Sequence, residues 1–181
     1  MHRSSRDEEF SAFVRAHRVD LLRSACLLTA GDVHLAEDLV QTALSRLYVA
    51  WPRVRRTGGQ SGYVWRTMVN AHVDETRRPR WRRERSVPDP PDRPAAASAD
   101  HAQETVDGQA VRAALAELAP RMRAVVVLRH WLDLSIEETA EILGCSHGTV
   151  KSQSAKAVAR LRGLLGDQNP VAGLTREEVH G

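Results

Sequence analysis

The sequence predicts an all-α chain, in which two small helical domains are joined by a flexible proline-rich linker. Apolar residues recur at spacings of three and four over most of the chain, as on one face of a helix. No segment keeps the two-residue alternation of a half-buried strand. Between the two periodic regions, "SVPDPPDRPAAASAD" (86–100) has four prolines and only one large apolar residue, Val87, so it cannot pack into a core. We expect domains at 7–85 and 108–166, a linker at 86–107 and a mobile tail at 167–181.

The first domain is predicted to hold three helices. The first runs over about 7–28, where apolar residues recur at helical spacing. Asp32 is a suitable N-cap for the second helix, which we expect to end before Pro52. The stretch "RVRRTGGQSG" (53–62) reads as a basic, glycine-bearing loop, and a third helix follows over about 62–77.

The second domain begins with a helix over 108–119, and Pro120 is expected to start the next. The run Val125–Val127 is compatible with a strand, but its polar and long-chain flanks favour a helix. Further on, Ser135 and Glu138 have the spacing of a capping box, which predicts a helix start.

That helix is expected to end at Gly144, which suits a left-handed C-terminal position, and Ser146 can cap another helix at once. Two helices joined by about three residues with a glycine are typical of a helix-turn-helix. The residues expected to face inward are Ile136, Ala140, Leu143, Val150, Ala157 and Leu161.

The outer face of the second of these helices carries small residues with basic residues at its flanks. The small ones are Gly148, Ser152, Ala155 and Ala159, and the basic ones are Lys151, Lys156 and Arg160. Small side chains let a helix enter the major groove of DNA deeply, and basic side chains reach phosphates. An ordinary solvated helix face is the alternative, but it would normally carry long Glu and Lys side chains. The pattern therefore favours DNA binding.

The net charge of +3 is small, but the charge is unevenly distributed. The stretch "RRPRWRRER" (77–85) holds six arginines against one glutamate, with Trp81 among them. A basic block of this kind indicates a polyanionic partner.

The composition also argues against several classes of protein. No apolar run approaches a membrane span, and the start lacks a secretory signal, so we expect a cytoplasmic protein with no membrane partner. Cys26 and Cys145 read as buried thiols, with a redox pair as the alternative. The eight histidines are scattered and no phosphate loop or nucleophile motif is present, so we expect no enzyme, metal, cofactor or small-molecule substrate.

Three blocks of sequence resemble the bacterial sigma-70 family. They are "AEDLVQTAL" (36–44), "MVNAHVDETRR" (68–78) and "LSIEETAEILGCSHGTVKSQSAKAVARLR" (134–162). The short two-domain form is similar to the extracytoplasmic-function (ECF) group. The stretches "GDVHLAEDLVQ" (31–41) and "GYVWRTMVN" (62–70) resemble its SigE-like actinobacterial subset. The resemblance implies that 7–85 is sigma region 2 and 108–166 is sigma region 4.

The resemblance implies a non-enzymatic factor that binds core RNA polymerase, directs it to promoters through the −10 and −35 elements, and promotes DNA opening. Its expected polymerase contacts are the clamp helices of the largest subunit and the flap region. An anti-sigma factor is a further partner that the family suggests, and whether this chain has one stays open. The residues that match the core-binding helix are Glu37, Asp38, Leu39, Val40 and Gln41. A simpler interpretation of Glu37 and Asp38 is that they complement the helix dipole.

In the second block, Asn70 matches the position beside the pocket for a flipped −10 base, where an amide can read a base edge. Trp65 is either a core residue, which we favour, or a stacking platform. Many relatives carry an aromatic where this chain has Val54. The residues expected at the −10 element are Arg55, Arg56, Gln60, Trp65, Asn70, Arg77, Arg78 and Arg80.

In the third block, the matched helix reads the −35 element. Gln153 stands where relatives often have arginine. The residues expected at the −35 element are Ser146, His147, Thr149, Lys151, Ser152, Ala155, Lys156 and Arg160.

Two other functions would each explain part of the sequence. A helix-turn-helix regulator outside the sigma group explains 134–162 but gives no purpose to "AEDLVQ" or to the arginine block. A basic RNA-binding protein explains only the arginine block.

Overall fold

The computed structural model describes residues 2–77 and 106–166, and every regular element among these residues is helical. The all-α prediction is therefore confirmed. The predicted tail and all of the predicted linker except its last two residues lie outside the described residues. Residues 106 and 107, expected in the linker, already belong to a helix.

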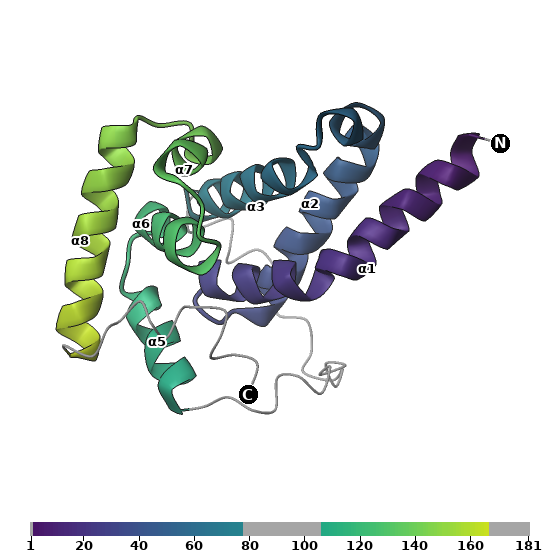
Figure 1. Cartoon of the computed structure of the whole chain (residues 1–181). Helices are drawn as coiled ribbons and strands as arrows, with labels where there is room; N and C mark the ends of the chain where they lie inside the picture. The colour runs from purple at the N-terminus through teal and green to yellow at the C-terminus, as the bar shows by residue number, and fades with distance from the viewer. Residues whose placement is uncertain (1, 78–105, 167–181) are drawn as a thin grey trace.

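The N-terminal half, residues 2–77, is built from three long helices (Figure 1). Its elements are α1 (His2–Leu28), α2 (Val33–Val54), the 3₁₀ turn η1 (Arg55–Thr57) and α3 (Gln60–Arg77). Asp32 caps α2 as predicted, because its carboxylate accepts a hydrogen bond of 3.0 Å from the amide of Leu35.

The prediction that α2 ends before Pro52 is wrong, since the helix continues through this residue to Val54. A proline inside a helix removes the amide that would bond to the carbonyl four residues earlier. Here that carbonyl belongs to Tyr48, and it accepts a hydrogen bond of 2.9 Å from the guanidinium of Arg6 on α1. The lost helical bond is thus replaced by a side chain from a neighbouring helix.

The C-terminal half, residues 106–166, contains shorter helices around the predicted helix-turn-helix (Figure 1). Its elements are α5 (Val106–Ala116), α6 (Pro120–Val126), the π-helical turn η3 (Val127–Trp131), α7 (Ile136–Leu143) and α8 (His147–Leu165). Pro120 opens α6 as predicted, and the Val125–Val127 run is helical. The helix expected over 108–119 ends earlier, at Ala116.

The two ends of α7 follow the predicted motifs. The Ser135 hydroxyl accepts from the amide of Glu138 at 3.0 Å, and the Glu138 carboxylate accepts from the amide of Ser135 at 2.8 Å. The bond that the Ser135 amide donates to the carboxylate is the main cause of a lowered pKa for the Glu138 carboxyl. At the other end, Gly144 adopts φ 60°, the left-handed conformation that favours glycine.

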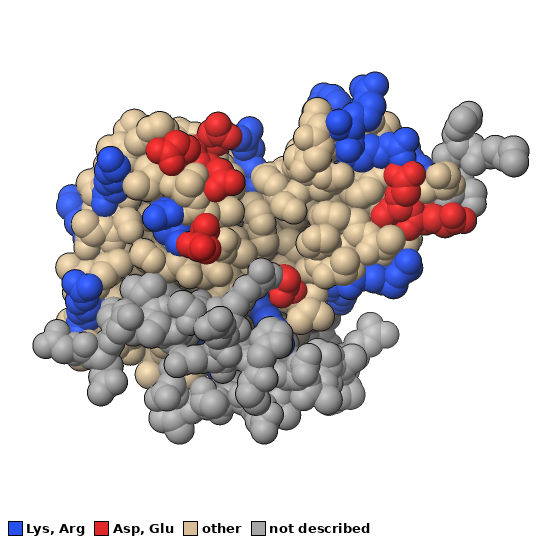
Figure 2. Space-filling view, viewed as in Figure 1, with Lys and Arg blue, Asp and Glu red and all other residues tan. Residues whose placement is uncertain are grey.

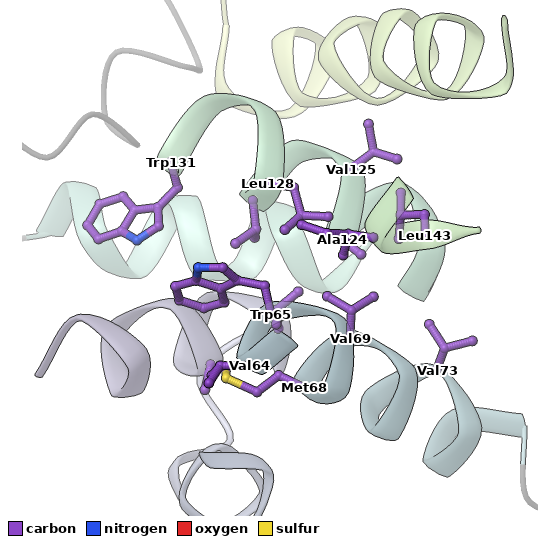
Figure 3. Packing of buried hydrophobic residues seen from close by; sticks show 14 of the residues in the cluster. Val64, Trp65, Met68, Val69, Val73, Ala124, Val125, Leu128, Trp131 and Leu143 are labelled. Carbon is purple, nitrogen blue, oxygen red and sulfur yellow. The ribbon is translucent and has the colours of Figure 1, made fainter. Parts of the chain in front are cut away.

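The two halves pack against each other and share a single hydrophobic core. In Figure 3, Trp65, Val69 and Val73 of α3 point towards residues of α6, η3 and α7. The separate domains expected from the sequence are therefore in close contact in this structure. We call the surface where they meet the seam.

Candidate nucleic-acid and polymerase interfaces

The start of α8 is organised by hydroxyl groups. Ser146 caps the helix by accepting a hydrogen bond of 3.1 Å from the amide of Thr149. The two hydroxyls, Ser146 Oγ and Thr149 Oγ1, lie 2.9 Å apart. Ser152 Oγ donates to the Thr149 carbonyl at 3.1 Å. These contacts fix a row of small hydroxyl groups at the end of the helix that is expected to read base edges.

The predicted division of α8 into a buried stripe and an open face is confirmed. Val150, Ala157 and Leu161 are at most 1% exposed. The small residues of the outer face, Gly148, Ser152, Ala155 and Ala159, are all exposed. Among the expected −35 residues, Thr149 is half-buried, and the exposed ones are Ser146, His147, Lys151, Ser152, Ala155, Lys156 and Arg160.

One basic side chain at the flank of this helix, that of Arg160, forms an ion pair within the protein. Arg160 Nη2 lies 3.5 Å from Glu117 Oε2, and both side chains are more than half exposed. Exposed ion pairs contribute little stability, so this pair does not prevent Arg160 from reaching a phosphate. In Figure 2, single basic side chains are spread along the edge of the molecule occupied by α8. The outer face of α8 is therefore suited to contact the DNA backbone at its flanks and to approach the base edges closely at its centre.

On α2, the expected polymerase-binding residues divide into exposed and buried ones. Glu37, Asp38 and Gln41 are exposed, whereas Leu39 and Val40 are 4% and 2% exposed. The exposed part of the expected surface is therefore polar. Neither carboxylate forms an ion pair with another described residue. Both lie beyond the first turn of α2, so the helix dipole accounts poorly for them.

The turn between α2 and α3 is basic and tightly folded. It reverses at Gly58, whose φ of 67° favours glycine. Arg55 forms an ion pair with Glu9 of α1, and its hydrogen bond is the main cause of a lowered pKa for the Glu9 carboxyl. Arg56 is exposed and Gln60 is half-buried. Figure 2 shows Lys and Arg side chains gathered over this turn.

On α3, the residues expected at the −10 element again divide into exposed and buried ones. Asn70 is exposed, so its amide is free to meet a base edge. Trp65 is only 8% exposed, and the preference for a core residue is confirmed. The side chain of Arg77, and Arg78 and Arg80 altogether, lie outside the described residues.

An open groove beside the α2–α3 turn, lined by residues of α2 and by Tyr63, was not among the predicted sites. Arg46, Val49, Ala50 and Arg53 share one face of α2 at spacings of three, four and seven, and this periodicity was the signal that could have identified them. Val49 is 78% exposed, more than any other large hydrophobic residue among those that the structure describes.

The two cysteines, expected from the sequence to be buried thiols, are only half-buried, and Cys26 and Cys145 form no disulfide with each other. The part of the chain that the structure describes holds no group of three His, Cys, Asp or Glu residues placed to bind a metal ion. Within the same residues, the helices are too short or too polar to cross a membrane.

Family models match both halves of the chain. Residues 13–83 match "Sigma-70 region 2" and residues 108–161 match "Sigma-70, region 4". The chain is 39% identical to an RNA polymerase sigma-E factor of Streptomyces coelicolor over 94% of both chains. It is 34% identical to the ECF RNA polymerase sigma factor SigM of Mycobacterium tuberculosis, over 92% of this chain and 82% of that one.

The fold is also similar to that of a solved structure, the sigma factor RpoE of Bartonella quintana in complex with the anti-sigma factor NepR. The TM-score is 0.70 at 23% identity, over 89% of this chain and 99% of that one. The α8 face, the helix-turn-helix and these matches agree. The chain belongs to the ECF group of the sigma-70 family and is a non-enzymatic RNA polymerase sigma factor that binds core polymerase and directs promoter-specific transcription initiation.

Proposed function

We propose that this sigma factor docks on core polymerase through the exposed residues Glu37, Asp38 and Gln41 of α2. Two exposed carboxylates and an amide on one helix suit a basic surface, and the clamp helices of the largest subunit are the expected one. The C-terminal half meets the flap region, which holds it over the −35 element. Polymerase and promoter both lie in the cytoplasm, and we place the protein there.

The −35 element is read by α8. The observation that carries this proposal is the exposed outer face of Gly148, Ser152, Ala155 and Ala159, because only short side chains let the helix backbone approach base edges. Lys151, Lys156 and Arg160 contact the flanking phosphates.

The −10 element is bound by the α2–α3 turn and the adjoining face of α3. Asn70 reads a base that has left the stack, and Arg56 and Gln60 line the same site. Arg55 binds a DNA phosphate in place of Glu9. This exchange costs little, because the ion pair between Arg55 and Glu9 is exposed and therefore weak. We count an anti-sigma factor among the proposed partners, because the solved relative is held in complex with one.

The experiment is transcription with core RNA polymerase of Streptomyces coelicolor on genomic DNA, followed by sequencing of the transcript starts. Transcripts that need this protein are expected to share −10 and −35 sequences. The variant Glu37→Ala/Asp38→Ala/Gln41→Ala should bind core polymerase roughly 10- to 100-fold more weakly, since it loses three polar contacts.

The matched control is Glu137→Ala/Glu141→Ala, which removes two exposed acids from α7 instead. It should bind polymerase like the unaltered protein. Equal affinity of the α2 variant and this control would contradict the proposed docking surface.

A further inference from the structure

The beginning of α1 lies against the end of α2 and is held there by directional contacts. The guanidinium of Arg6 donates to the carbonyl of Tyr48 at 2.9 Å and lies 4.3 Å from the centroid of the Tyr48 ring. The Tyr48 hydroxyl donates to the carboxylate of Asp7 at 2.8 Å. Phe10 meets the rings of Tyr48 and Trp51 edge-on, with centroids 5.1 and 5.3 Å apart. These contacts fix which residues of α1 face the α2–α3 turn.

Glu9 extends this set of contacts to the turn itself. Its carboxylate forms an ion pair with Arg55, the first residue of η1. The side chains of Glu9 and Arg55 are 45% and 43% exposed. Arg55 holds the pKa of the Glu9 carboxyl below its usual value, so the carboxylate is charged at neutral pH. The pair is open to water, and a phosphate can therefore approach Arg55.

The turn that carries Arg55 has a backbone held by local features. Thr57 Oγ1 donates to the carbonyl of Val54 at 2.9 Å, and Gly58 reverses the chain at φ 67°. Neither feature involves Glu9. We therefore expect replacement of Glu9 to change the surroundings of the Arg55 side chain and to leave the backbone of the turn in place.

The ion pair offsets part of the positive charge at this turn. Arg53, Arg55 and Arg56 place three positive charges within four residues, and Figure 2 shows acidic side chains next to the basic ones at this end of the molecule. A guanidinium binds a carboxylate and a phosphate through the same planar set of donors. While Glu9 holds Arg55, it occupies donors that a DNA phosphate would use.

This competition affects promoter DNA and unrelated DNA differently. Every DNA strand supplies phosphates, so an arginine that is free to bind them raises affinity without regard to sequence. On a promoter, a base bound at Asn70 holds the adjoining backbone near the turn, where its phosphate competes with Glu9 at a high effective concentration. On unrelated DNA no such base contact holds the backbone, and Arg55 stays with Glu9 more often. Glu9 therefore weakens binding to unrelated DNA more than binding to a promoter.

We propose that Glu9 is a specificity-determining residue, which competes with DNA phosphate for Arg55 and so limits binding to DNA that lacks a −10 element. This inference rests on the proposed function, since it takes Arg55 to contact the backbone of the −10 element. Exposed ion pairs are weak, so the effect on affinity is expected to be about two- to fivefold.

The test compares Glu9→Gln, which keeps the side-chain length and removes the charge, with Glu8→Gln. Glu8 is exposed one residue earlier on α1, so the control removes the same charge from the same helix. Each variant is assembled with core polymerase of Streptomyces coelicolor. Fluorescence anisotropy then measures binding to a promoter defined by its transcript start and to a scrambled duplex, over a range of salt concentrations.

Glu9→Gln is expected to bind the scrambled duplex about two- to fivefold more tightly than Glu8→Gln does. The gain on promoter DNA should be smaller, so the preference for the promoter falls. On the scrambled duplex, the slope of log K against log salt should steepen by up to about 0.9, because Arg55 gains a phosphate contact. A loss of helix packing would not steepen this slope. Equal affinities and slopes for the two variants would overturn the inference.

The same two substitutions are repeated in an Arg55→Gln background to show whether Glu9 acts through Arg55. In this background, Glu9→Gln and Glu8→Gln should bind each DNA alike, and a difference that persists would also overturn the inference. Arg55→Gln alone should weaken promoter binding. If it does not, the proposed −10 contact of Arg55 fails and the inference fails with it. If it does, and Glu9→Gln still matches Glu8→Gln, the −10 contact stands and only the role of Glu9 fails.

Discussion

Arg123 shows how one buried residue organises the seam. From α6, Arg123 Nη1 donates to the carbonyl of Leu28, at the end of α1, at 3.0 Å. Its guanidinium also donates to the carbonyls of Leu115 at 2.8 Å, Ala116 at 3.2 Å and Leu118 at 3.1 Å. Carbonyls at helix ends carry partial negative charge, which offsets the cost of burying the cation. Burial still lowers the pKa of Arg123. Only the Leu28 bond crosses the seam, and the other three lie within the C-terminal half.

His72 lies buried on α3 near this cation and makes the folded structure sensitive to acid. Burial and the charge of Arg123 lower its pKa from 6.5 to about 4. The unfolded chain therefore binds a proton that the folded chain does not, between these two values. The free energy of unfolding should be unaffected by His72 above pH 6.5 and decline as the pH falls towards 4, by at most about 3 kcal/mol.

Denaturant unfolding at pH 7.0, 6.0 and 5.0 measures this effect. Neither ring nitrogen of His72 has a hydrogen-bond partner among the described residues, so His72→Leu loses no bond and should flatten the decline. His34→Leu, at an exposed position, is the control and should leave the decline in place. A decline of the same size in His72→Leu would show that other groups cause it.

At the scale of elements, α7 holds α8 in position, and its own start depends on the capping box of Ser135 and Glu138. Ser135→Ala removes the acceptor for the Glu138 amide and should lower the free energy of unfolding by about 1 kcal/mol. For a chain of this size, the melting temperature should fall by roughly 2–4 °C. Thermal unfolding followed by circular dichroism measures it, with Ser11→Ala in the exposed middle of α1 as the control. A fall of equal size in both variants would mean that the cap contributes nothing specific.

The elements that the sequence predicted correctly are those with local causes. The capping box, the glycine at φ 60° and the inward stripe of α8 each depend on residues three or four positions apart. The end of α2 was predicted wrongly because its cause is not local: the carbonyl that Pro52 leaves free is bonded by Arg6, 42 residues before Tyr48. A periodicity argument contains no information about such a partner.

The same distinction applies to the candidate site. The open face of α8 follows from its helical period, and so does the exposure of Glu37, Asp38 and Gln41. The burial of Trp65 on the seam side of α3 depends on packing against the other half, as does the role of Arg123. In sequence, Arg123 looks like an ordinary basic residue near the start of a helix, because its acceptors are carbonyls that any residue supplies.

At the scale of the whole molecule, the packing of the two halves against each other bears on how the free protein meets promoter DNA. The α8 face stays exposed, whereas α3 packs against α6 and α7 of the half that carries α8. We expect core polymerase to fix the spacing of the two halves, which raises the effective concentration of the second DNA contact once the first is made.

The free protein should therefore bind promoter DNA weakly, with a dissociation constant in the micromolar range or above at physiological salt and little preference for promoter sequence. With core polymerase, binding should become sequence-specific.

In the complex with core polymerase, Ser152→Ala/Lys156→Ala should weaken promoter binding about tenfold or more, since it removes a base-edge hydroxyl and a phosphate contact. In the free protein, Lys156→Ala alone should reduce the slope of log K against log salt by about 0.9. Fluorescence anisotropy on promoter and scrambled DNA measures the dissociation constant of the free protein, the effect of the double variant and the salt slope. The control is Ser11→Ala/Arg18→Ala, which replaces two exposed residues of α1. Tight, promoter-specific binding by the free protein would contradict this account and favour a conventional helix-turn-helix regulator.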